Sequence, residues 1–306
     1  MPTSYPLYTA TGAVKDTALT VPCSSPRPAG LACGDYAVNT IQPPYQPYAP
    51  GTAEARRLPP QTAATIGDRL SGKGIDWAWY SGGWSNANGD VGGPGWTNGA
   101  GPSCSDPDTA TGAMFPNCPD KLFQYHHQAF NYFQAYAPGT AARRQHLRDE
   151  DEFEALAAAS NRHCRLKPVS IVKPIGAENE HPGYASVHTG SDHLVDLLKA
   201  VTGSRCAKDT MIVVTYDEFG GQWDHVPPPG QGPTTRGPHD EMGPSSRIPA
   251  LTIAPGLDRG FGVDHASHDT TSIMATIEHR FGLRPVTSRD ARVQDLSTVF
   301  GRGGHH

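Results

Sequence analysis

The sequence predicts an α/β fold, with a mainly parallel sheet flanked by helices. Short apolar runs rich in β-branched residues alternate along the chain with longer segments of helical character, a pattern typical of parallel sheets covered by helices. Polar residues follow the ends of those runs, where open α/β sheets bind their ligands. With 306 residues, the chain is long enough for one large domain or two small ones.

Composition argues against several classes of protein. The net charge of −5 and the pI of about 6.3 leave no basic footprint for nucleic acid. No run of 18 apolar residues occurs, so we expect no membrane span. The first residues lack the basic segment and apolar core of a signal peptide. The 34 glycines and 29 prolines indicate a globular protein with much loop.

Six cysteines suggest three disulfides, although six cysteines allow 15 connectivities. The expected pairs are Cys23–Cys33, Cys104–Cys118 and Cys164–Cys206. No C-x-x-C pair occurs, which argues against zinc-finger and thioredoxin chemistry. Disulfides persist in oxidising compartments, and this expectation conflicts with the missing signal peptide.

The most informative stretch begins with the apolar run 211–214, which predicts a buried strand. The residues that follow are Asp217, Glu218, a glycine pair, Asp224, His225 and three prolines. Adjacent carboxylates after a strand serve either as a helix cap and first turn or as the wall of a hard-metal site. The glycines and the Asp-His pair favour the metal site.

The N-terminal third contains an arm, a helix and a strand. Residues 1–60 are rich in proline and predict an extended arm, followed by a domain over 61–306. A short helix is expected over 65–74, with Thr65 as its cap and Asp68 at its third position. Residues 75–81 then alternate as a strand.

Helices and strands continue to alternate in the rest of the chain. We expect helices over 149–159, 192–201 and 270–281, the last ended by Gly282, and strands over 168–172 and 247–255. The acidic start of the first of these helices is interpreted as a solvated helix start that complements the helix dipole.

Histidines and acids gather after three strands, at 178–181, 217–225 and 264–269. His181 precedes a proline, which holds its backbone extended. The last group contains Asp264, His265, His268 and Asp269. Carboxylates with histidines suit a divalent cation and a phosphate ester. The sequence has no H-E-x-x-H, G-x-S-x-G or P-loop motif, so metalloprotease, α/β-hydrolase and P-loop functions are disfavoured.

An aromatic segment, 123–133, is expected to be at least partly helical. His126 and His127 are neighbours in it, so they should point in different directions and at most one should face a given site. A histidine among aromatic residues serves more often in packing than in function.

Several motifs closely resemble the bacterial phosphoesterase family, which contains acid phosphatases and phosphatidylcholine-type phospholipases C and is related to the alkaline phosphatase superfamily. The motifs are TYDEFGGQWDHVPP (215–228), NEHPG (179–183), RIPA (247–250) and DHASHDTTSI (264–273). Further matches are AVNTIQPPYQP (37–47), TIGDRL (65–70), WAWYSGGW (77–84) and FQYHHQAFNYF (123–133). The resemblance covers about residues 35–300, and the acid phosphatase branch fits best.

The resemblance implies hydrolysis of phosphate monoesters at one divalent metal ion through a phosphoryl-enzyme. Asp217 and Glu218 match the acidic pair that binds the metal. His181 matches a histidine that contacts phosphate, as does one of His126 and His127. The remaining matches are Asp224 and His225, expected in catalysis, and Asp264, His265, His268 and Asp269, expected to support the site or to cap a helix.

The sequence also departs from the family pattern. Members begin with a strand and a Glu-Asn-x-Ser/Asn-Phe-Asp motif that supplies the other metal ligands, followed by a hydroxyl nucleophile before the region matched at 37–40. Neither segment is present, so we expect the C-terminal portion of a longer exported enzyme, secreted or periplasmic. Its sheet would lack the first strand, its nucleophile would lie upstream, and its activity would be reduced or lost. Thr62 and Thr65 are the first hydroxyls after the arm, but Thr65 is better explained as a helix cap.

Three functions follow from these observations. The leading hypothesis is a metal-dependent hydrolase of phosphate monoesters, of acid phosphatase type. The alternative enzyme is a phospholipase C-type phosphodiesterase. The alternative of another class is a non-catalytic secreted module that keeps the fold. Turnover of a phosphate ester, and its loss in Asp217→Asn, would distinguish the enzymes from the module.

Overall fold

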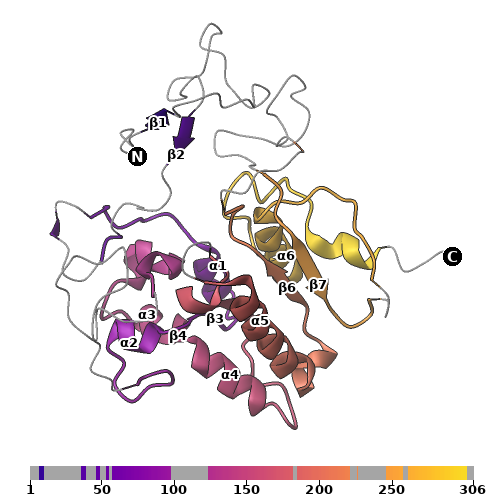
Figure 1. Ribbon diagram of the computed structural model, residues 1–306, viewed down its shortest axis with the longest axis horizontal. Coiled ribbons are helices and arrows are strands. Elements are labelled where there is room, and N and C mark those ends of the chain that lie inside the picture. The colour runs from indigo at the N-terminus through magenta and orange to yellow at the C-terminus, as the bar shows by residue number, and fades with distance from the viewer. Residues whose placement is uncertain are drawn as a thin grey trace, which may run out of the picture. The chain divides into compact units, whose positions relative to one another are not determined.

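The computed structural model describes residues 7–9, 36–38, 46–48, 53–54, 57–97, 123–181, 185–220, 226, 246–257 and 261–301 (Figure 1). The chain divides into two compact units. One contains Met1–Gln42 with Val214–Leu251, and the other contains Pro43–Val213 with Thr252–His306. The domain boundary expected at residue 60 stays a prediction.

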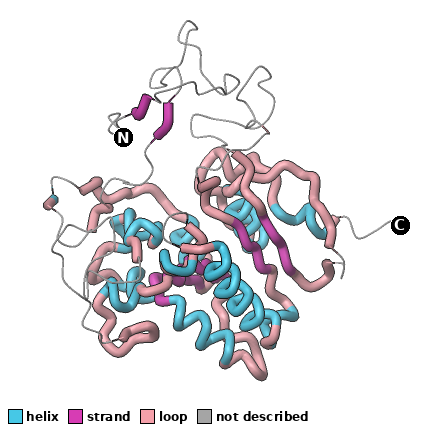
Figure 2. The backbone as a smooth tube through the Cα atoms, in the orientation of Figure 1, coloured by secondary structure: helices cyan, strands magenta, loops and turns pink. Residues whose placement is uncertain are grey.

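A three-stranded parallel sheet forms the centre of the larger unit (Figure 2). Its strands are β3 (Trp77–Ser81), β4 (Leu147–Asp149) and β5 (Val169–Lys173), in the order β4-β3-β5. Ser81 lies opposite both Asp149 and Lys173, so the last residues of all three strands share one edge. This parallel sheet among helices confirms the predicted α/β fold.

Side chains of β3 alternate between two apolar clusters, as the period of a strand requires. Trp77 joins a cluster with Leu70 and Phe130, whereas Ala78 and Tyr80 join one with Phe153 and Leu197. Apolar side chains therefore cover both faces of the sheet, which buries Trp77, Ala78 and Tyr80 completely.

The α-helices are α1 (Ile66–Gly72), α2 (Trp84–Asn88), α3 (Ala141–His146), α4 (Glu150–Ala158), α5 (Val187–Thr202) and α6 (Thr271–Phe281). Helices α1, α4, α5 and α6 lie close to the predicted positions, whereas α2 and α3 were not predicted. The aromatic segment forms the short 3-10 helices η2 (Tyr125–His127), η3 (Ala129–Tyr132) and η4 (Gln134–Tyr136), and others are η5 (Gly176–Glu178), η6 (Arg205–Lys208) and η7 (Leu296–Phe300). None of the helices in the described part is long and apolar enough to cross a membrane.

Local capping explains most helix boundaries. Thr65 caps α1 and exchanges hydrogen bonds with Asp68, and Gly282 ends α6 with a φ of 60°. Both caps were predicted. Helix α5 begins earlier than expected because the Ser186 side chain accepts a hydrogen bond from the Thr189 N–H and caps it there.

The predicted Cys164–Cys206 disulfide is present. It ties the segment after α4 to η6, and Cys206 is fully buried in the cluster around Tyr80. The other two predicted pairs, Cys23–Cys33 and Cys104–Cys118, lie outside the described residues.

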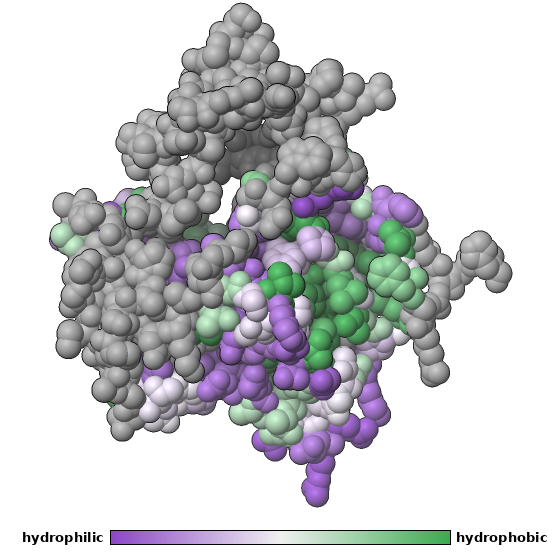
Figure 3. Space-filling view, in the orientation of Figure 1, coloured by the Kyte–Doolittle hydropathy of each residue, from purple (hydrophilic) through white to green (hydrophobic). Residues whose placement is uncertain are grey.

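The strand expected at 211–214 exists as β6 (Ile212–Thr215), but the expectation that it is buried is wrong. All four of its residues are partly exposed. Within the described part of the chain, β6 pairs with β7 (Ala250–Ile253) in a sheet of two strands, so little covers its faces. Figure 3 shows apolar side chains gathered at the surface over these strands, and Leu251 is among the exposed large hydrophobic residues.

A second small sheet lies in the segment predicted as an extended arm. Strand β1 (Leu7–Thr9) pairs antiparallel with β2 (Tyr36–Val38), and Leu7 lies opposite Val38.

Candidate functional site

Three basic side chains lie within electrostatic range of His127, near the carboxyl end of β5. The rings of His126 and His127 lie edge to face, with their centroids 4.4 Å apart. Lys173, His126 and His181 are all close enough for their charges to act on His127. Lys173 is the last residue of β5, so the group, here called the basic cluster, lies at the edge where α/β sheets bind ligands.

The aromatic core holds the two neighbouring histidines in place. Tyr125 is buried, and its hydroxyl donates a 2.7 Å hydrogen bond to the carbonyl of Ala87. The short helix η2 ends at His127, and both histidines stay partly exposed. The expectation that these rings would point in different directions is wrong, because the two side chains lean together into one contact.

Burial decides the protonation of His127. Burial, together with the positive charges of Lys173, His126 and His181, lowers the pKa of His127 to about 2. A charged imidazolium is disfavoured both in an apolar environment and beside like charges. His127 is therefore neutral over the working range of pH, and it offers one N–H donor and one acceptor.

A left-handed backbone residue precedes His181. Glu180 has a φ of 64°, the one positive value for a non-glycine residue in the described part of the chain. The Glu180 carboxylate accepts a 2.8 Å hydrogen bond from Ser191 Oγ, and the His181 N–H donates to Asn179 Oδ1 at 3.0 Å. Such strain persists where the surroundings impose it, often at functional sites. Here it positions an exposed histidine.

Close packing of α5 supports this conformation. A side chain at Gly190 would place its Cβ 2.2 Å from Glu180 Cγ. Glycine at this position therefore lets α5 approach the turn that carries Glu180 and His181.

A further group of titratable side chains, formed by His193, Glu150 and Glu178, lies at the same sheet edge and was not predicted. His193 Nε2 lies 2.9 Å from Glu150 Oε1, and His193 Nδ1 lies 3.8 Å from Glu178 Oε2. Burial raises the pKa of Glu150, whereas the hydrogen bond that His193 donates to Glu150 is the largest cause that raises the pKa of His193. This contact holds the start of α4 against α5.

The acidic start of α4 was expected to be solvated, but part of it is not. Asp149 and Glu150 are both buried. Asp149 accepts hydrogen bonds from the backbone N–H groups of Ser85 at 2.7 Å and Asp151 at 3.1 Å, and burial raises its pKa to about 6. The sequence signal that identifies these acids is their place where a short strand ends and a helix begins.

Asp217 and Glu218 follow β6, as predicted, and belong to the smaller unit. Both side chains are exposed, and Glu218 Oε2 accepts a 2.8 Å hydrogen bond from the Gly220 N–H. Asp224 and His225 lie outside the described residues.

The expected metal ion needs more donors than this acidic pair provides. Carboxylate oxygens are the donors that hard divalent cations prefer, so Asp217 and Glu218 fit such an ion in kind. Within the described ranges, however, no three His, Cys, Asp or Glu side chains group together. The described residues therefore account for at most part of a metal site.

Asp264 and His268 contact each other, as their shared motif suggested. Asp264 accepts hydrogen bonds from Thr298 Oγ1 at 2.5 Å and from the Ala266 N–H at 3.0 Å, and it lies 3.3 Å from His268 Nε2. The bond from Thr298, more than the others, lowers the pKa of Asp264 to about 2. This arrangement anchors the loop before α6 to η7.

Asp269 stabilises the start of α6. Its Oδ1 accepts from the Thr271 N–H at 2.7 Å, and its Oδ2 accepts from Arg289 Nε at 3.1 Å. His265, by contrast, is exposed.

Comparisons with known proteins identify the family to which the sequence is similar. The sequence profile of the phosphoesterase family matches residues 21–284. Phospholipase C B of Mycobacterium tuberculosis is 35% identical over 164 residues, which cover 47% of this chain and 31% of that protein. Non-specific phospholipase C6 of Arabidopsis thaliana is 30% identical over 153 residues, covering 42% of this chain and 29% of the relative. The matched region thus spans less than a third of each of these relatives.

Proposed function

This chain belongs to the phosphoesterase family, and from that premise we propose that it hydrolyses phosphate esters, as a phosphomonoesterase of acid phosphatase type. The observation that carries the proposal is the basic cluster of His126, His127, His181 and Lys173. Cationic and N–H donors that converge at the edge of a parallel sheet suit a phosphoryl group.

Each member of the basic cluster has a separate role in this proposal. Lys173 neutralises phosphoryl oxygens as a point charge. His127, kept neutral by burial, donates an N–H hydrogen bond and does not act as the acid. Protonation of the departing alcohol oxygen then falls to His126 or His181, since proton transfer from a positioned histidine is a common means of general acid catalysis.

We further propose that Asp217 and Glu218 hold one divalent metal ion. When bound, such an ion would neutralise charge on the phosphate ester. Asp224 and His225 remain proposed catalytic residues on the basis of their motif. Chelation should lower turnover, and added divalent metal should restore it to the parent chain but not to Asp217→Asn.

A phospholipase C-type activity is the second candidate. The names of the relatives favour it, since the matched proteins of Mycobacterium tuberculosis and Arabidopsis thaliana are phospholipases C. The two candidates differ in substrate, because a phospholipase C cleaves a phosphodiester whereas an acid phosphatase cleaves a monoester.

We also propose that the protein is exported. The Cys164–Cys206 disulfide supports this, because disulfides persist in oxidising compartments. Fractionation of the source cells, with immunodetection of the chain, would test it; detection in the cytosolic fraction alone would contradict export.

The test of function compares a chromogenic phosphate monoester with a chromogenic phosphorylcholine diester across acid to neutral pH. We expect turnover to fall at least tenfold in His126→Ala and His181→Ala. His188→Ala is the matched control, because His188 is an exposed residue of α5 that pairs with Asp192. Turnover of the monoester supports the acid phosphatase type, and turnover of the diester supports the phospholipase C type.

Two results would contradict the proposal. Full activity of both histidine variants would show that the basic cluster does not bind the substrate. Absence of turnover of either ester by the folded protein, not restored in a chain extended upstream, would favour the non-catalytic module.

A further inference from the structure

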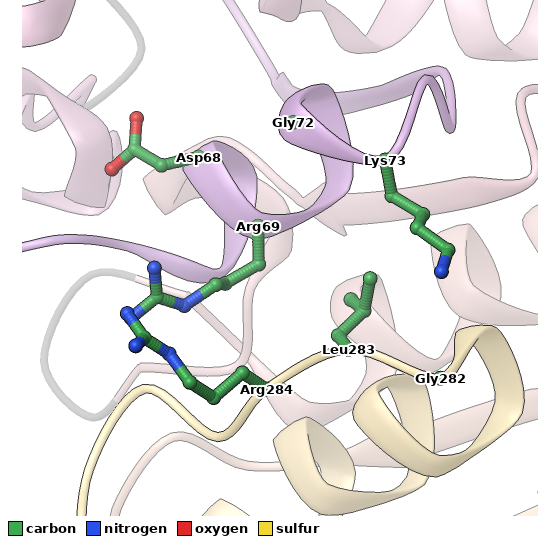
Figure 4. A pocket seen from close by; sticks show the side chains of 7 residues that line it. All are labelled: Asp68, Arg69, Gly72, Lys73, Gly282, Leu283 and Arg284. Carbon is green, nitrogen blue, oxygen red and sulfur yellow. The ribbon is translucent and has the colours of Figure 1, made fainter.

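A basic pocket lies between α1 and the residues that follow α6, both within the larger unit. Its volume is about 300 Å³. Figure 4 shows Arg69 and Lys73 reaching it from the α1 side and Arg284 from the segment after α6, beside Leu283. Three cations from two distant parts of the sequence thus line one hollow.

The positive charges of Arg69 and Arg284 lie close together without a salt-bridge partner in the described part of the chain. Their guanidinium groups point toward one another (Figure 4), and like charges at close range repel each other. In the described part of the chain, Arg69, Lys73 and Arg284 form no salt bridge. Arg69 Nε is also buried without a hydrogen-bond partner, and leaving such a donor unpaired costs free energy.

Asp68, the one acid in the pocket wall, already accepts hydrogen bonds from other residues. Asp68 Oδ2 accepts hydrogen bonds from Thr65 N at 2.7 Å and Thr65 Oγ1 at 2.8 Å, and Asp68 Oδ1 accepts from the Tyr136 hydroxyl at 3.3 Å. Figure 4 shows its carboxylate turned away from the arginines. Asp68 is therefore a helix cap, and its single negative charge offsets only one of the three positive charges in the pocket wall.

We propose that this pocket binds a phosphate-type oxyanion, either free phosphate or the phosphate of an anionic lipid head group. A phosphate carries close to two negative charges at neutral pH, which would offset the two positive charges that Asp68 leaves over. Guanidinium groups match phosphate oxygens with paired, charge-assisted hydrogen bonds. An anion between Arg69 and Arg284 would also give the buried Arg69 Nε a partner.

The pocket is separate from the basic cluster. Helix α1 ends at Gly72 and β3 begins at Trp77, so Gly72 and Lys73 lie near the amino ends of the parallel strands. The basic cluster contains Lys173, at the carboxyl end of β5. An anion in this pocket would therefore not occupy the proposed catalytic site, and its binding does not depend on the proposed hydrolysis.

The first experiment titrates the protein with inorganic phosphate by calorimetry at constant ionic strength, with His181→Ala as background so that the basic cluster contributes less. We expect Arg69→Gln and Arg284→Gln each to weaken binding by about tenfold, since each removes charge-assisted hydrogen bonds. The matched control is Arg292→Gln, an exposed arginine outside the pocket, which should bind as the parent does. Arg284 is exposed, so its variant should fold even where Arg69→Gln does not.

The second experiment identifies the source of the phosphate. Vesicles of phosphatidylcholine are compared with vesicles that also contain phosphatidic acid, by co-sedimentation. Enrichment on the acidic vesicles, lost in Arg284→Gln but kept in Arg292→Gln, would support a lipid head group, and phosphate binding alone would support a free anion. The proposal would be overturned if neither phosphate binding nor vesicle binding depended on Arg69 or Arg284. This holds whatever the result of the hydrolysis assay.

Discussion

The pKa values of two histidines at the same sheet edge are shifted in opposite directions. His127 is kept neutral, because it is desolvated and faces like charges, whereas His193 has a raised pKa, because it donates to the buried Glu150. The same residue type is thus held neutral in one position, and its charged form is favoured in the other. The protonation of each histidine at this edge therefore depends on the groups that surround its ring.

The protonation of His127 can be observed directly. We expect its ring resonances in an NMR titration to stay in the neutral position through mildly acidic pH, because its pKa is lowered to about 2. A midpoint for His127 close to the ordinary histidine value of 6.5 would contradict the proposed role of a neutral donor.

Lys173 should contribute to the binding of phosphate by the basic cluster. Lys173→Gln removes a charge that acts on His127, so we expect the KM for a monoester to rise about tenfold, which corresponds to the loss of one charge-assisted hydrogen bond. Lys199→Gln is the control, because Lys199 is exposed on α5 and pairs with Asp196. An unchanged KM in Lys173→Gln would remove Lys173 from the site.

Glu278 should make the stability of the protein depend on pH. This residue of α6 is buried, and burial together with Asp290 raises its pKa to about 7. A carboxyl with a raised pKa stabilises the fold fully below its ordinary value of 4.5, and that contribution is lost as the pH rises through about 7. The loss amounts to roughly 3 kcal/mol.

Glu278→Gln tests this dependence. Denaturant unfolding at acidic and at mildly alkaline pH should show a smaller difference between the two conditions in Glu278→Gln than in the parent. Asp196→Asn, which changes an exposed carboxylate, should keep the parental difference. An equal pH dependence in Glu278→Gln and the parent would show that another group is responsible.

At the scale of elements, α1 depends on a cap that the sequence predicts. The Thr65 side chain and the Asp68 carboxylate exchange hydrogen bonds at its start. Thr65→Ala should lower the free energy of unfolding by about 1 kcal/mol without loss of hydrolysis. Thr62→Ala, at an exposed position, should change neither. Loss of turnover in Thr65→Ala with stability intact would instead identify Thr65 as a nucleophile.

The Cys164–Cys206 disulfide connects elements that are 42 residues apart in sequence. A cross-link closing a loop of this length stabilises the native state by about 4 kcal/mol in the chain-entropy account. The double variant Cys164→Ala/Cys206→Ala should therefore unfold at a lower denaturant concentration than the parent under oxidising conditions. Equal midpoints for the two proteins would show that the disulfide contributes nothing to stability.

At the scale of the whole molecule, the proposed functional groups are divided between two compact units. The basic cluster belongs to the larger unit, and Asp217 and Glu218 belong to the smaller one. Asp217→Asn changes an exposed side chain, so stability should shift by no more than about 0.5 kcal/mol.

Asp217→Asn should nevertheless abolish turnover, while phosphate still binds to the basic cluster. Enzyme assays and phosphate titrations on the same preparation, in an Arg284→Gln background so that the pocket beside α1 binds less phosphate, would measure both effects. Parental turnover in this variant would show that Asp217 is not a metal ligand, and loss of phosphate binding would show that the cluster does not bind anions by itself.

Local signals in the sequence identified most elements and several contacts. The capped helix α1, the strands β3 and β5, helix α6 with its terminal glycine and the Cys164–Cys206 pair were all predicted. Each rests on short-range periodicity, on capping chemistry or on the pairing of few cysteines. The family motifs likewise identified His126, His127 and His181 as candidates before their positions were known.

Only the tertiary structure decided which of these residues meet and how exposed each one is. It brought His181 to within electrostatic reach of His127, paired Glu150 with His193 and placed Arg284 beside Arg69. It also left β6 partly exposed, where its apolar sequence had predicted burial. Local pattern specifies what a segment can form, whereas burial and long-range contacts depend on how distant segments pack, and no short window of sequence contains that information.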